Sequence, residues 1–94
     1  MPRRFSLSAT VSTDSPLLIL PALEGLVGKD SVRRVGGNEF AVETTMNGND
    51  PKDLNRALLS GLRRVEKRTR LRSEWKDGGK TYRFFDYVLK RVSG

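Results

Sequence analysis

The residues best suited to bind a ligand are the seven arginines and lysines among residues 54–72. On a helix with about 100° per residue, six of them fall within about 120° of Arg56. The apolar residues Leu54, Leu58, Leu62 and Val65, with Gly61, fall on the opposite side, at about 140° to 240°. The pattern predicts an amphipathic helix with a basic stripe about 21 Å long. The candidate nucleic-acid-binding residues are Arg56, Arg63, Arg64, Lys67, Arg68 and Arg70.

Two interpretations of this stripe compete. A basic face is the footprint expected of a phosphate-binding surface, and the planar fork of arginine suits phosphate. A surface helix that only faces water also exposes Lys and Arg, because both are good helix formers. The single sign of the stripe favours the first interpretation, since a merely solvated helix mixes charges into i, i+4 pairs. Glu66 is its only acidic interruption.

The charge of the whole chain is lopsided. The formal net charge is +7, but residues 1–51 hold five basic and six acidic side chains, whereas residues 52–94 hold thirteen basic and five acidic ones. Such asymmetry favours an anionic partner, either nucleic acid or an acidic protein. Further basic residues lie near the two ends, at Arg3, Arg4, Lys90 and Arg91.

Catalytic and metal chemistry have little support. The chain has no cysteine and no histidine, which removes thiolates, the commonest metal ligand and the usual neutral-pH acid–base group. The carboxylates are scattered, and the Gly-Lys pairs in "GKDS" and "DGGKT" lack the spacing of a phosphate-binding loop. We therefore expect no enzyme, no metal and no cofactor.

The longest apolar run, "PLLILPAL", is far short of the ~20 residues that cross a bilayer, and no signal-peptide core follows "MPRRF", so a cytoplasmic protein is expected.

The first half of the chain predicts a strand, a helix and a hairpin. Residues 3–12 alternate, with Phe5, Leu7, Ala9 and Val11 on one face, which indicates a half-buried strand. Ser15 as N-cap and Pro16 at the first helical position resemble a helix start, but Pro21 is unfavourable inside a helix. We expect the helix to begin either at Pro16 or, after an extended or turn-like entry, nearer Leu20, and to end at Gly28. Residues 31–48 predict a hairpin that turns at Gly36-Gly37.

The second half predicts a helix followed by a second hairpin. Asp50 and Pro51 are expected to cap and begin the basic helix. The turn of the hairpin is expected at Asp77-Gly78-Gly79. Its last strand has large residues in both phases, with Tyr82, Phe84 and Val88 against Phe85, Tyr87 and Leu89. We expect Trp75 and these aromatic residues to pack in the core or to form an interface.

The order of the elements is β-α-β-β-α-β-β over one domain, residues 1–94. This interleaving predicts an α+β, ferredoxin-like (split β-α-β) two-layer sandwich, in which two helices cover one face of an antiparallel sheet. The other face would expose Ser6, Ser8, Thr10, Ala41, Glu43 and Thr45, none of which is aromatic.

Three functional hypotheses follow from these patterns. The first is a small non-enzymatic module that binds nucleic acid non-specifically through the basic helix face. The second is a protein-interaction subunit or homodimer that uses the polar sheet face or the C-terminal hairpin. The third, weaker one is an enzyme or ligand-binding subunit with a site between protomers, because a chain this short forms only a modest core.

Overall fold

The computed structural model describes residues 3–85. Residues 1–2 and 86–94 lie outside the described residues, and so do five residues that the sequence analysis singled out: Tyr87, Val88, Leu89, Lys90 and Arg91. The predicted order β-α-β-β-α-β-β is confirmed. The elements are β1 (Arg3–Ser12), α1 (Pro16–Val27), the short 3-10 turn η1 (Lys29–Ser31), β2 (Val32–Gly36), β3 (Glu39–Gly48), α2 (Pro51–Arg63), β4 (Arg70–Asp77) and β5 (Lys80–Phe85).

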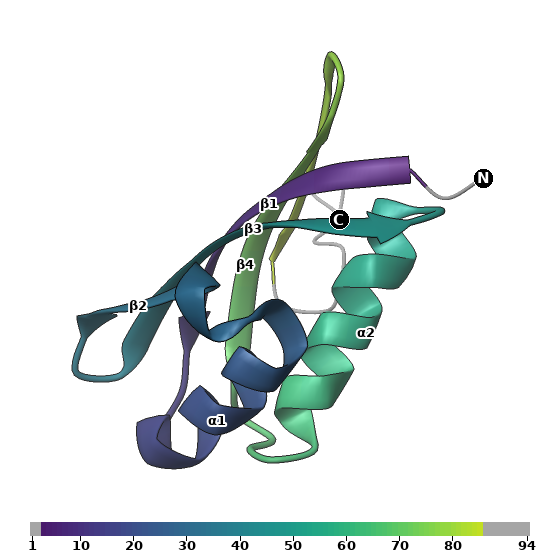
Figure 1. The fold of residues 1–94 in the computed structure, drawn as a ribbon. Coiled ribbons are helices and arrows are strands. Elements are labelled where there is room, and N and C mark those ends of the chain that lie inside the picture. The colour runs from purple at the N-terminus through teal and green to yellow at the C-terminus, as the bar shows by residue number, and fades with distance from the viewer. Residues whose placement is uncertain (1–2, 86–94) are drawn as a thin grey trace.

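The strands form one antiparallel sheet in the order β2-β3-β1-β4-β5. β1 lies at its centre, where Ser8 is opposite Glu43 of β3 and Glu74 of β4. Helices α1 and α2 lie side by side on one face of the sheet (Figure 1). Within residues 3–85, no helix is long and apolar enough to cross a membrane.

The core lies between this face and the helices. The alternation predicted for β1 is confirmed, because Phe5, Leu7, Ala9 and Val11 are buried. The two helices and the neighbouring strands complete the core with Ile19, Leu23, Val27, Phe40, Val42, Leu58, Leu59, Leu62, Leu71, Trp75 and Phe84. Gly61 allows the two helices to approach closely, since a Cβ atom there would lie 3.0 Å from Cδ1 of Leu26.

The start of α1 follows the first of the two predicted alternatives. The helix begins at Pro16, not near Leu20, and the backbone amides of Leu18 and Ile19 both donate to the Ser15 carbonyl. Pro21 lies inside the helix on its exposed side. The carbonyl four residues earlier belongs to Leu17, which is also exposed, so water can replace the hydrogen bond that proline cannot make. The helix ends where predicted, with Gly28 at a φ of 99° that favours glycine.

The other turns are close to their predictions. Asp50 caps α2 by accepting a hydrogen bond from the Lys52 amide at 2.9 Å. The first hairpin turns at Gly37 and Asn38, one residue later than expected, because Gly36 still pairs with Glu39. The second hairpin turns at Gly78 and Gly79, as predicted.

Candidate anion-binding cleft

The continuous helical stripe of cations is not formed, because α2 ends at Arg63 and β4 begins at Arg70. After Arg63 the amides of Val65 and Glu66 both donate to the Leu62 carbonyl, at 3.0 and 3.1 Å, and the chain then leaves the helix. Val65 was expected in the buried stripe but is 42% exposed. Of the six predicted residues, Arg56 and Arg63 belong to α2, Arg64, Lys67 and Arg68 lie in the connection, and Arg70 is the first residue of β4.

Residues 63–70 are here called the basic loop. Their single carboxylate, that of Glu66, anchors the loop to the rest of the fold. Oε2 of Glu66 accepts a hydrogen bond from the Ser15 hydroxyl at 3.0 Å, and Oε1 accepts one from the Arg68 amide at 3.0 Å. The Arg68 amide is the main cause, and the Ser15 hydroxyl the second, of a lowered pKa for Glu66. Glu66 is therefore ionised at neutral pH, with both carboxylate oxygens engaged in holding the loop against the start of α1.

A second tether joins the basic loop to the connection between β1 and α1. Thr69 is buried, and its hydroxyl donates to the Thr13 hydroxyl at 3.3 Å. Nε of Arg63 donates to the Thr69 carbonyl at 3.0 Å. Together with the contact between Ser15 and Glu66, these bonds fix where the loop's cations lie relative to the end of β1.

At this end of the sheet the structure contains a cleft of about 820 Å³, here called the end cleft. The basic loop forms one side, and the end of β1 and the β2–β3 hairpin form the others. Its lining residues are Ser12, Thr13 and Asp14, then Gly36, Gly37, Asn38 and Glu39, and finally Arg63, Arg68 and Arg70.

The end cleft is positive on the side of the basic loop and acidic on the other. Arg68 and Arg70 are exposed, and within residues 3–85 neither guanidinium group makes a hydrogen bond or an ion pair at contact distance. Asp14 and Glu39 supply the negative charge, and Glu39 accepts a hydrogen bond from the Ser12 hydroxyl at 3.3 Å. An anion would therefore be attracted to the arginine side of the cleft and repelled from the opposite side.

The fold brings only part of the predicted set together. Arg63, Arg68 and Arg70 line the end cleft, whereas Arg56, Arg64 and Lys67 are exposed outside its lining. The remaining lining residues were not singled out from the sequence. They come from segments about 25 to 55 residues away along the chain, and no spacing motif signals that they meet the basic loop.

The two basic residues near the N-terminal end, Arg3 and Arg4, begin β1 and do not line the end cleft. Arg3 is at the opposite end of β1 from the cleft, where it forms an ion pair with Asp77 at 3.0 Å. Its guanidinium carbon is also 5.1 Å from the centre of the Phe5 ring. Arg3 therefore does not contribute to the positive side of the end cleft.

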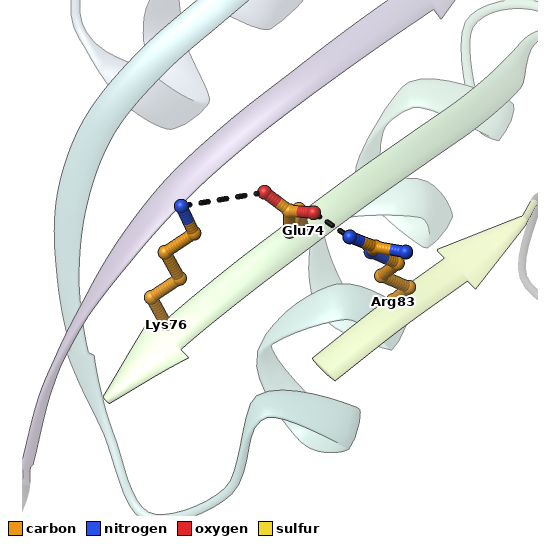
Figure 2. Close-up of polar contacts among 3 residues, drawn as sticks. All are labelled: Glu74, Lys76 and Arg83. Atoms are coloured by element: carbon orange, nitrogen blue, oxygen red, sulfur yellow. Dashed lines mark hydrogen bonds and ion pairs between the residues drawn. The ribbon is translucent and has the colours of Figure 1, made fainter. Parts of the chain in front are cut away.

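The face of the sheet opposite the helices, here called the open face, has the polar residues expected on β1 and β3. It continues onto β4 and β5, where Glu74 lies between two cations (Figure 2). Oε2 of Glu74 is 2.8 Å from Nε of Arg83, and Oε1 is 3.6 Å from Nζ of Lys76. The hydrogen bond from Arg83 is the main cause of a lowered pKa for Glu74, so this carboxylate is ionised and matched by neighbouring cations.

A buried polar cluster holds α2 against β4 and so helps to set the geometry of the basic loop. Asn55 is 2% exposed, and its side-chain oxygen accepts hydrogen bonds from the Ser73 hydroxyl and from the indole nitrogen of Trp75, the latter at 3.2 Å. Sequence reasoning missed Asn55. At about 260° on the helical wheel it borders the apolar stripe, which is the one signal that it could be buried.

No group of three or more acidic side chains placed to hold a metal ion occurs within residues 3–85. Comparisons of the chain with protein-family models, with curated proteins and with solved structures find no match, so no relative supplies a role for any residue of the end cleft.

Proposed function

We propose that this chain is a small non-enzymatic module of the ferredoxin-like (split β-α-β) type, extended by β5, that binds nucleic acid through its phosphate backbone. Two features support the fold assignment: a sheet in which β3 separates β1 from β2, and both helices on one face. They match the split β-α-β arrangement. The functional part of the proposal depends on the charges of the basic loop.

The observation that carries the proposal is the state of Glu66. The basic loop has five cations, and its one carboxylate is already bound by Ser15 and by the loop's own backbone. Glu66 keeps its negative charge and attracts Arg68, but five cations against one carboxylate leave the basic loop with a net charge of +4. A guanidinium group binds phosphate in a bidentate manner, and two such groups, on Arg68 and Arg70, line an open cleft.

The acidic side of the end cleft restricts where a phosphate would bind. Asp14 and Glu39 repel a second anion, so the backbone of a nucleic acid would follow the arginine side and not fill the cleft. Contacts of this kind carry no base specificity, because phosphate is the same at every nucleotide. Non-specific binding is therefore the expected mode.

The test is fluorescence polarisation with labelled DNA and RNA over a range of salt concentrations. Binding should weaken as salt rises, with a slope in log K against log salt of about −0.7 to −0.9 for each phosphate contacted. The variant Arg68→Glu/Arg70→Glu should lose most of the affinity at low salt and show a slope shallower by about two contacts.

A matched control carries the same change in charge at the other end of the molecule. Lys52 in the first turn of α2 and Lys80 at the start of β5 are exposed. The start of α2 and the β4–β5 turn lie far from the β2–β3 hairpin (Figure 1). Lys52→Glu/Lys80→Glu should retain most of the affinity, since long-range effects of net charge are screened by salt. Equal losses in the two variants would refute a role for the basic loop, and wild-type protein that binds no nucleic acid at low salt would refute the function.

A second candidate function is assembly through the C-terminal hairpin. The observation that favours it is the position of β5 at the edge of the sheet of described strands, where a further strand could add. Sedimentation velocity over a wide range of protein concentration tests this, because a homodimer would give a sedimentation coefficient that increases with concentration. A monomer at every concentration would reject homo-oligomerisation.

A further inference from the structure

Phe85 lies on the edge strand β5 and places an aromatic side chain on the open face. The prediction that this face carries no aromatic residue concerned only the central strands. In β5 the side chains of Tyr82 and Phe84 point into the core, and Phe85 points to the other side and is 46% exposed. Its ring borders a shallow depression of about 240 Å³ whose lining includes Ser8, Thr10, Arg72, Arg83 and Phe85. This volume is below the about 300–1,000 Å³ typical of drug-sized ligands, so the depression suits a single ring system.

Arg72 connects this ring to the end cleft. It is opposite Phe85 in the β4–β5 register, and its guanidinium carbon lies 6.0 Å from the ring centre. Arg70 precedes it by two residues on the same face of β4, about 6.6 Å away along the strand, and Arg70 also lines the end cleft. One row of guanidinium groups therefore runs from the end cleft to Phe85.

The charges around Phe85 suit an anionic ligand. Glu74 is the carboxylate beside the depression, and it is matched by Arg83 and Lys76. An exposed cation–π contact at 6.0 Å contributes only about 0.5–1 kcal/mol, so Arg72 can leave the ring for a phosphate at small cost. Ser8 and Thr10 are small and add hydroxyl groups beside the ring without covering it.

From this arrangement we propose that the open face binds a single-stranded nucleic acid, with one unpaired base stacked on Phe85, its phosphate on Arg72 and the preceding backbone on the arginines of the end cleft. The inference depends on the proposed function and makes it more specific, because a base can stack on Phe85 only when it is free of a duplex. An aromatic surface of this kind accepts any base, so the binding remains independent of sequence.

The test compares three labelled probes at low salt: oligothymidylate, an abasic strand with the same number of phosphates, and duplex DNA. Wild-type protein should bind oligothymidylate more tightly than the abasic strand. Phe85→Ala should weaken oligothymidylate binding by about five- to 150-fold, the range measured for loss of one stacked base, and leave the abasic strand unaffected.

Control variants separate stacking from other effects. Phe85→Trp should retain the affinity, whereas Phe85→Leu, which keeps apolar surface without a π-face, should resemble Phe85→Ala. Leu17→Ala removes another large exposed side chain, 81% exposed on α1, and should change nothing. Fluorescence of the buried Trp75 reports whether the alanine and leucine variants remain folded. Because Phe85→Trp adds a second tryptophan, circular dichroism is used to check its folding.

The possible failures are distinguishable. If wild-type protein binds none of the probes, the proposed function fails and this inference fails with it. If it binds all three equally and Phe85→Ala has no effect, the stacking site is wrong while the phosphate-binding function stands. If Phe85→Ala changes the sedimentation coefficient and not the affinity, the open face is a contact between copies of the chain, and the inference is overturned.

Discussion

Replacing Asn55 with alanine should destabilise the protein by about 1–5 kcal/mol, because it removes one oxygen that serves two buried donors. That oxygen accepts from Ser73 Oγ and Trp75 Nε1, and within residues 3–85 every buried side-chain polar atom has a partner. Each orphaned donor costs about 1–3 kcal/mol, and the higher helix propensity of alanine offsets at most about 0.7 kcal/mol. The loss is a large part of the about 5–14 kcal/mol expected for a chain of this length.

The assay is equilibrium unfolding in urea, followed by Trp75 fluorescence and by circular dichroism. Two probes are needed because Trp75 is itself a partner of Asn55. Ser60→Ala, at an exposed position of the same helix, serves as the control and should change stability by less than about 0.5 kcal/mol.

A double-mutant cycle with Ser73 makes the prediction specific. In the wild-type background Ser73→Ala removes a buried hydrogen bond and should lower stability by about 1 kcal/mol. In the Asn55→Ala background the same change removes an orphaned hydroxyl and should raise stability. If Ser73→Ala has the same sign in both backgrounds, or if Asn55→Ala is nearly neutral, the cluster does not hold α2 against β4 as inferred.

Two further predictions concern the loop and α1. The lowered pKa of Glu66 means that its ionised form stabilises the folded state at neutral pH, and this contribution is lost as the pH falls through and below the ordinary value of 4.5. Glu66→Gln should therefore be less stable than wild type at neutral pH, and urea unfolding at acidic pH should show the difference disappearing; a constant difference would contradict the role of the charge. Pro21→Ala should raise the free energy of unfolding by about 1–2 kcal/mol, since it restores a helical hydrogen bond but also increases the freedom of the unfolded chain. A lower midpoint in thermal unfolding of Pro21→Ala would contradict this prediction and show that Pro21 stabilises the folded protein.

The strands were predictable because their signals are local. The alternation of β1 places four apolar residues on one side of the strand with no exception. The strand can bury all four only if that side faces the helices. The cap of α2 was equally local, since Asp50 and Pro51 act within one turn. The start of α1 stayed open between Pro16 and Leu20, because the sequence does not reveal that Pro21 lies on the exposed side of the helix.

The end of α2 was misjudged because two periodicities overlap in the sequence. Val65 continues the helical pattern by coincidence, whereas Thr69, Leu71, Ser73 and Trp75 are buried at every second residue, as in a strand. Greater weight on the second pattern would have ended the helix before Thr69. The basic character of the segment was evident from its residue types, but the end cleft was not, because its other sides come from β1 and the β2–β3 hairpin.

The basic loop lacks the helical backbone that the sequence predicted, yet its backbone is still held in place by long-range contacts. In the folded chain Glu66 and Thr69 tie the basic loop to Ser15 and Thr13, more than fifty residues earlier. The backbone that carries Arg68 and Arg70 is thus fixed before any ligand arrives, and this preorganisation lowers the entropic cost of binding phosphate.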